Sequence, residues 1–152
     1  MLTRSDGHRY GDGTAMTEQD LLDAVGQGES FGWEFKSARG GVPGSIWDTY
    51  SAMANTLGGT IVLGVDEKDG VFSVTGLPDP AHAQKSIWDT LNDRGKISAN
   101  LCRNDDVRRL AIGASEVLVI RVRQAFRRER PIYIGQNRRS GPDARRPIGV
   151  AT

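Results

Sequence analysis

Asn55-Thr56-Leu57-Gly58-Gly59 is followed directly by Thr60-Ile61-Val62-Leu63-Gly64-Val65 and then by Asp66-Glu67. Thr60 to Val65 is almost wholly apolar and β-branched, which is typical of a central strand covered on both faces. The glycine pair before it ends a helix and lets the backbone pass tightly into the strand. Because residues 66–70 have turn composition, Val71 to Val74 is predicted to be the hairpin partner of this strand.

Three helices are predicted around this strand, each from a capping residue and a stripe of apolar side chains. Thr17 and Ser45 can each cap a helix start, and Asp79-Pro80 places a cap residue before a proline at the first helical position. Apolar residues with helical spacing follow each start, as on the buried face of a helix. They are Leu21, Leu22 and Val25; Ile46, Tyr50, Met53, Ala54 and Leu57; and Ala83, Ile87 and Leu91.

Further strands are predicted before and after the central one in the chain. Trp33 to Lys36 alternates apolar and polar residues, as a half-buried strand does. Val107 to Ile112 and Val117 to Val122 are predicted to form a second hairpin around Gly113-Ala114-Ser115, and Pro131 to Ile134 a last short strand. The predicted class is α+β, with about three helices and a mixed, mostly antiparallel sheet in a single domain.

The length and composition limit the classes of protein to consider. The 152 residues fit one domain, which we place at residues 17–137 between a loose tail at 1–16 and an irregular basic tail at 138–152. No apolar run reaches the roughly 18 residues of a membrane helix, and the N-terminus lacks the apolar centre of a signal peptide. With one cysteine, Cys102, no internal disulfide forms, and two histidines leave little material for a zinc site. A cytoplasmic protein that does not associate with membranes is expected.

The near-neutral total charge hides an asymmetry along the chain. Residues 1–76 contain 11 acidic and 5 basic residues, whereas residues 77–152 contain 8 acidic and 15 basic ones. Nine arginines lie between Arg121 and Arg146, against only Glu129 and Asp143. Such a cluster is the electrostatic footprint of a protein that binds a polyanion. A solvated face followed by a basic tail explains the same residues equally well.

The sequence lacks the motifs of several enzyme classes. There is no Gly-x-x-x-x-Gly-Lys-Ser/Thr loop for nucleoside triphosphates. The glycines at 58, 59 and 64 do not form a dinucleotide fingerprint and lie on the wrong side of the strand for the usual strand-to-helix phosphate turn. There is also no Gly-x-Ser-x-Gly nucleophile elbow.

Acidic residues are the better candidates for chemistry. Glu29 lies in a glycine-flanked turn, Glu34 on the polar face of the first predicted strand, and Asp66 at the end of the central strand, with Glu67 next to it. Three carboxylates that converge at one edge can hold Mg²⁺ or Mn²⁺, which activates water for attack on a phosphodiester. The simpler interpretation is that Glu34 pairs with Lys36 and that Asp66 is an ordinary turn residue; the spacing alone favours this one.

Three segments together resemble one known family. Glu29-Ser30-Phe31-Gly32-Trp33-Glu34-Phe35-Lys36 is similar to its opening signature, Glu-Ser-x-x-x-Glu-Phe-Lys. Residues 51–67 are similar to its core motif, Ala-Phe-Ala-Asn-Thr-x-Gly-Gly followed by an apolar strand and Gly-Val-Asp. Arg130-Pro131-Ile132-Tyr133-Ile134 is similar to its Arg-Pro-Val-Tyr strand. The family is the Schlafen-type AlbA-like domain, a nucleic-acid-binding module common in bacterial regulator-like proteins, and the resemblance covers about residues 17–137.

The resemblance also implies a catalytic alternative. Schlafen members that cleave RNA hold a metal on three acidic residues, which correspond here to Glu29, Glu34 and either Asp66 or Glu67. The sequence departs from the family pattern at Met53, where phenylalanine is usual. It departs again after residue 137, where relatives often continue into a further strand and a winged helix.

Three functional hypotheses follow. The leading one is a nucleic-acid-binding domain without a cofactor, whose phosphate contacts come from a set of basic residues. The second is a Mg²⁺- or Mn²⁺-dependent endoribonuclease acting on tRNA or rRNA through Glu29, Glu34 and Asp66. The third is a homodimeric interaction domain in which acidic and basic halves pair. The sequence leaves open DNA against RNA, the oligomeric state and the pathway. The predicted phosphate-binding residues are Lys36, Arg121, Arg123, Arg127, Arg128 and Arg130.

Overall fold

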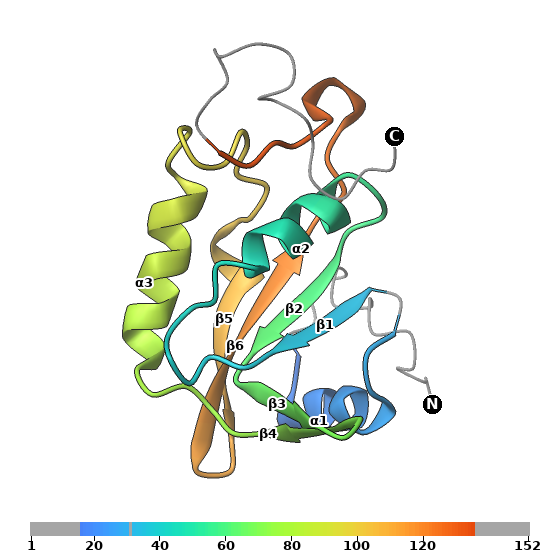
Figure 1. The fold of residues 1–152 in the computed structure, drawn as a ribbon, viewed down its shortest axis with the longest axis vertical. Coiled ribbons are helices and arrows are strands. Elements are labelled where there is room, and N and C mark those ends of the chain that lie inside the picture. The colour runs from blue at the N-terminus through green and yellow to red at the C-terminus, as the bar shows by residue number, and fades with distance from the viewer. Residues whose placement is uncertain (1–15, 31, 136–152) are drawn as a thin grey trace.

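The centre of the molecule is a four-stranded sheet with the order β1-β2-β6-β5, seen in a computed structural model that describes residues 16–30 and 32–135 (Figure 1). These strands are β1 (Trp33–Lys36), β2 (Gly59–Leu63), β6 (Ser115–Val122) and β5 (Val107–Ile112). β1 runs parallel to β2, and the other neighbours are antiparallel. All five residues of β2 are buried, so the predicted central strand is confirmed. The α+β class and the mixed sheet are confirmed with it.

A second, two-stranded sheet corrects the predicted first hairpin. Val71–Val74 (β4) pairs with Val65–Lys68 (β3) rather than with the central strand. Strand β2 ends before Gly64, where the backbone turns with a φ of +108°, a conformation that suits a residue without a Cβ. A Cβ there would lie 3.2 Å from Val117 Cγ1 and from the Gly76 carbonyl carbon, so the turn is also tightly packed. Asp66 therefore lies within a strand and not in a turn.

The three predicted helices are present as α1 (Glu18–Gln27), α2 (Ile46–Ala54) and α3 (Pro80–Leu91). Thr17 and Asp20 form the predicted capping box of α1, and the Asp79 carboxylate accepts the His82 amide at the start of α3. Ser45 precedes α2 as expected but makes no side-chain capping bond. Two short 3₁₀ turns, η2 (Asn104–Asp106) and η3 (Arg127–Glu129), complete the elements.

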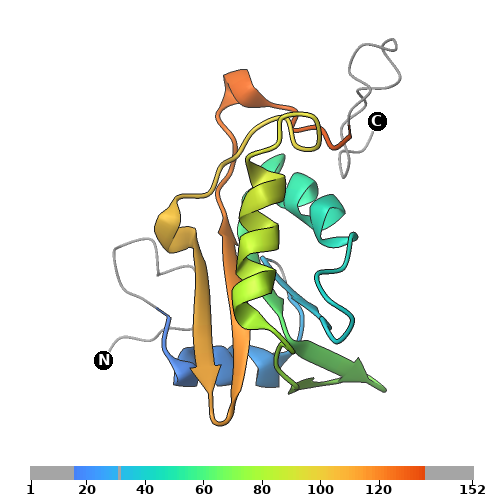
Figure 2. The ribbon, with the colours of Figure 1, turned by 90° about the vertical axis from the view of Figure 1, so that its left-hand side faces the viewer.

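The helices cover the two faces of the sheet separately, as Figures 1 and 2 show. α2 and α3 pack on one face against β2, β5 and β6, where Ile61, Leu118 and Ile120 are buried. α1 packs on the opposite face, where Leu21 and Val25 join Val62, Val117 and Val119. Leu57 does not belong to the apolar face of α2, because the helix ends at Ala54 and 65% of Leu57 is exposed.

The predicted strand at Pro131 to Ile134 does not form. Only an isolated bridge links Ile97 to Ile134, and the Arg130–Pro131 peptide bond is cis. Ile132 is fully buried in the apolar core all the same, and the Asn55 side chain supplies the backbone hydrogen bonds that a neighbouring strand would otherwise make. Its Oδ1 accepts the Ile132 amide at 2.7 Å, and its Nδ2 donates to the Ile132 carbonyl at 3.3 Å.

No helix in the described part of the chain is long and apolar enough to cross a membrane. The tails predicted at 1–16 and 138–152 lie outside the described residues, apart from Met16.

Candidate functional site

Glu29 and Glu34 lie together beside the outer edge of β1. The Glu29 Oε2 atom accepts the Phe35 amide at 3.1 Å, which satisfies a donor that this edge strand turns away from β2. Glu34 Oε2 lies 3.5 Å from Lys36 Nζ. Partial burial raises the pKa of the Glu34 carboxyl, the neighbouring Glu29 raises it further, and Lys36 opposes both effects. The effect of Glu29 on this pKa is the electrostatic repulsion expected between two neighbouring carboxylates.

Asp66 has different partners. Its Oδ2 atom lies 2.6 Å from Arg39 Nε, and its Oδ1 atom accepts the Thr75 hydroxyl at 3.0 Å. The hydrogen bonds from Arg39 and Ser37 lower the pKa of the Asp66 carboxyl. Asp66 thus ties the segment after β1 to the β3–β4 hairpin.

The structure does not bring the predicted ligands Glu29, Glu34 and Asp66 together. Among residues 16–30 and 32–135, no group of three His, Cys, Asp or Glu side chains is close enough to hold a metal ion. Glu67, the alternative third ligand, is exposed on β3. The first two acids form a pair beside Lys36, and the third is bound to a guanidinium. This arrangement does not fit a ready Mg²⁺ or Mn²⁺ site.

The basic residues predicted to bind phosphates do not form one continuous cluster in the structure. Lys36 is level with Leu63 in the sheet, whereas Arg121 is paired with Thr60, so the two lie toward opposite ends of β2. Arg123 forms two hydrogen bonds to the buried carboxylate of Asp106, with Nε 3.2 Å from Oδ2 and one terminal nitrogen 3.3 Å from Oδ1. Removing Arg123 would leave the buried Asp106 carboxylate without this partner, so the Arg123 guanidinium is engaged in stabilising the fold.

Arg121 borders a pocket of about 360 Å³ at the start of β2. The Gly58-Gly59 pair shapes this region through packing, because a Cβ at Gly58 would lie 2.6 Å from the Val122 carbonyl oxygen. Gly58 also has a φ of +81°. The pocket is lined by Leu57, Gly59, Thr60, Arg121, Val122, Arg123 and Gln124.

The remaining predicted arginines stand on the loop that leaves β6. Arg127, Arg128 and Arg130 are exposed on and beside η3, which projects past the end of the sheet in Figures 1 and 2. Among the described residues, none of these three takes part in an ion pair. Phe126 opens the same turn with 65% of its surface exposed, and the Arg128 guanidinium lies 5.3 Å above its ring centre. Sequence reasoning missed Phe126, although an aromatic residue inside an arginine run was a usable signal.

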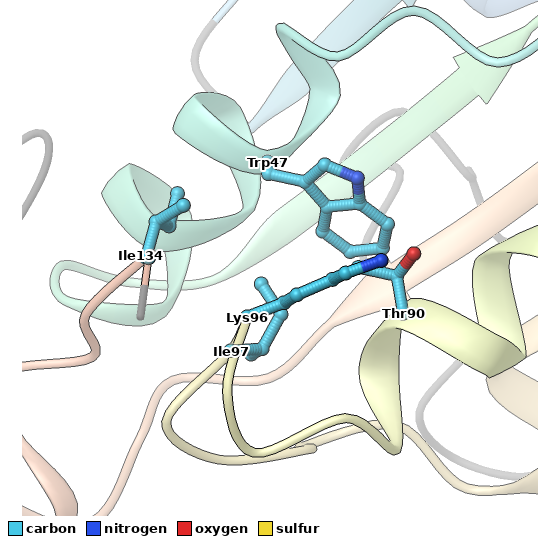
Figure 3. Close-up of a pocket in the computed structure, with 6 residues that line it drawn as sticks. Trp47, Thr90, Lys96, Ile97 and Ile134 are labelled. Carbon is cyan, nitrogen blue, oxygen red and sulfur yellow. The ribbon is translucent and has the colours of Figure 1, made fainter. Parts of the chain in front are cut away.

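A second pocket, of about 400 Å³, lies between α2, α3 and the loop after α3 (Figure 3). Trp47 from α2 and Thr90 from α3 line it together with Lys96. Among the described residues, its lining offers one cation, Lys96, whereas the η3 loop offers three arginines. Within the described residues, the η3 loop therefore carries the denser positive charge of these two places, and dense positive charge attracts polyanions.

Comparison with known proteins identifies relatives of the domain. The family described as Schlafen, AlbA_2 matches residues 29–141. The solution structure of the N-terminal domain of a RecG-related protein from Nitrosomonas europaea, named after an ATP-dependent DNA helicase, aligns with a TM-score of 0.65 and 28% identity. That alignment covers 90% of this chain and 91% of the other. The DIP2311 protein of Corynebacterium diphtheriae aligns with a TM-score of 0.48 and 22% identity over 84% of this chain and 25% of its own. No curated protein matches the sequence.

Proposed function

The chain belongs to the Schlafen AlbA_2 family, and on that basis we propose that it is a nucleic-acid-binding domain whose phosphate contacts come from the loop after β6. The observation that carries the proposal is the exposed trio Arg127, Arg128 and Arg130, which has no ion-pair partner among the described residues. An unneutralised cluster of this kind attracts phosphates and releases their counterions on binding. The RecG-related neighbour, named after a DNA helicase, supports the same class of ligand.

The predicted basic residues divide into roles under this proposal. Arg127 and Arg128 contact the phosphate backbone of the nucleic acid, because both side chains are exposed and neither forms an ion pair with another described residue. Arg123 does not, since it is bound to Asp106. Lys36 lies toward the other end of β2 beside Glu34 and contributes little to the same contact.

A salt titration of the Arg127→Ala/Arg128→Ala double variant tests the proposal. On a single strand each phosphate contact contributes about 0.7 to the slope of log affinity against log salt. Loss of two contacts therefore lowers the slope by roughly 1.4 and the affinity by about 25-fold at 0.1 M salt. Fluorescence anisotropy of a labelled oligonucleotide measures both quantities.

The chain supplies a matched control for this experiment. Arg108 and Arg109 are also adjacent, exposed arginines, but they lie on the edge strand β5. The Arg108→Ala/Arg109→Ala variant removes the same net charge from a different surface, so its slope should change much less. Equal losses in both double variants, or no loss in either, would contradict a site at the η3 loop.

The endoribonuclease alternative has narrower support. Glu29 and Glu34 lie together, and partial burial together with the Glu29 charge raises the pKa of the Glu34 carboxyl. A third ligand would require Asp66 to give up its contact with Arg39. The binding proposal needs no such rearrangement and is therefore preferred.

A further inference from the structure

Phe126 has a solvent-exposed aromatic ring beside two arginines that form no ion pair with any other described residue. Large apolar side chains are normally buried, yet 65% of Phe126 is exposed. It directly precedes η3, where Arg127 and Arg128 stand exposed. An aromatic ring beside phosphate-binding cations is the combination that single-stranded nucleic acid uses, because the ring stacks a base while the cations hold the backbone.

The backbone of Phe126 is fixed although its ring is exposed. Its amide donates to Glu129 Oε1 at 3.0 Å, and its carbonyl accepts the Glu129 amide at 2.8 Å. The preceding residue, Ala125, donates to the Ala54 carbonyl at 2.9 Å and so anchors the loop to the end of α2. A ring on an ordered backbone loses little conformational entropy when a ligand stacks on it.

The Phe126 ring also carries a cation on one side. The Arg128 guanidinium lies 5.3 Å from the ring centre, within the range of a cation–π contact. Arg128 is therefore held near the place that a stacked nucleotide would occupy.

The Arg121 pocket begins two residues before Phe126 along the chain. Gln124, one of its lining residues, is separated from Phe126 only by Ala125. Leu57, which is also exposed, forms another part of the rim. The pocket and the ring together therefore offer one ligand a cation, Arg121, and two exposed apolar side chains, Leu57 and Phe126. A single strand of nucleic acid likewise presents both phosphates and bases.

We propose that Phe126 is a stacking platform for an unpaired base and that Arg121 in the neighbouring pocket holds a phosphate of the same strand, so that the site selects single-stranded over duplex nucleic acid. This inference rests on the proposed nucleic-acid binding and names the form of its ligand. In a duplex the base faces are covered by their neighbours in the stack, so the ring would have no partner there.

The test compares wild type with two variants of Phe126 on three probes. The probes are a labelled 20-nucleotide single strand (as DNA and as RNA), an abasic single strand of the same length, and the corresponding duplex. Phe126→Ala should weaken binding to the base-containing strand by roughly 5- to 150-fold, the range for loss of one stacked base. Binding to the abasic strand and the salt slope should not change, because no phosphate contact is lost. Phe126→Trp should retain the wild-type affinity.

Val71→Ala is the matched control, because Val71 is 68% exposed on the β3–β4 hairpin, away from the η3 loop. Equal wild-type affinity for the base-containing and abasic strands would overturn the inference, as would a Phe126→Ala variant that binds as wild type does. In both cases an arginine-dependent salt slope would leave the proposed function standing. Failure of wild type to bind any probe would instead remove the proposed function itself. A Phe126→Ala variant that changes only the oligomeric state would assign the ring to self-association and overturn the inference too.

Discussion

Asn55→Ala removes the side chain that joins the end of α2 to the segment after Pro131. Asn55 Oδ1 accepts the Ile132 amide at 2.7 Å, and Nδ2 donates to the Ile132 carbonyl at 3.3 Å and to Ser51 Oγ at 3.2 Å. Ile132 is fully buried, so water cannot easily replace the lost partner. The Ile132 carbonyl keeps a donor in the Ser51 hydroxyl, at 2.9 Å, but its amide is left unpaired.

The expected loss of stability follows from these bonds. A buried donor left without a partner costs about 1–3 kcal/mol, and each lost neutral hydrogen bond about 1 kcal/mol. We therefore expect Asn55→Ala to lower the free energy of unfolding by about 3 kcal/mol, a large share of the about 5–15 kcal/mol of a typical domain. Urea unfolding followed by tryptophan fluorescence measures it, with an unchanged slope against denaturant.

Asn92→Ala is the control for Asn55→Ala. Asn92 also occupies a helix C-cap, that of α3, but its side chain is exposed, and its Oδ1 accepts a hydrogen bond from Asn100 Nδ2 at 2.9 Å. Its removal should cost about 0.5 kcal/mol, as at an ordinary surface position. A loss below about 1 kcal/mol for Asn55→Ala would refute the reasoning. So would a stable variant that no longer binds nucleic acid, because Asn55 would then be a contact residue rather than a structural one.

Two further predictions concern the acidic residues. The pKa of Glu34 is raised above its ordinary value of 4.5 in the folded protein, so the folded protein binds this proton more tightly than the unfolded chain does. As pH rises above 4.5 and Glu34 ionises, the free energy of unfolding should therefore decrease. Glu34→Gln should remove this decrease in melting temperature as pH rises above 4.5, and an identical pH profile in the variant would count against the assignment. Wild-type protein incubated with labelled tRNA and either Mg²⁺ or Mn²⁺ should bind the RNA without cleaving it. Cleavage that Glu34→Gln abolishes would establish the endoribonuclease instead.

The elements that could be predicted from the sequence are those with local causes. The capping box at Thr17 and Asp20 and the cap at Asp79 formed as predicted, since a cap needs only residues one turn apart. The burial of β2 followed from its uninterrupted apolar composition. The resemblance to the family likewise rested on short segments, at residues 29–36, 51–67 and 130–134.

The errors in the predicted fold came from pairings between distant residues. The apolar run from Thr60 to Val65 looks like one strand, but Gly64 turns the backbone and Val65 starts another sheet. Pro131 to Ile134 has strand composition, yet Ile132 takes its hydrogen bonds from Asn55, 77 residues earlier. Composition indicates that such a segment is buried, but not what lies beside it.

For the candidate site, the sequence by itself determined the supply of groups: an arginine-rich second half, acidic residues near the first strand, and an α+β domain to carry them. The tertiary structure alone decided which of these groups are free. In the sequence, Arg123 and Asp66 do not differ from the charged residues near them. In the folded protein, however, Arg123 forms an ion pair with Asp106, and Asp66 forms one with Arg39. Arg127, Arg128 and Phe126 stay exposed at the end of β6. The reason is that the strength of a charge depends on the distance to its partner and on its burial, and folding sets both by bringing together residues far apart in the chain.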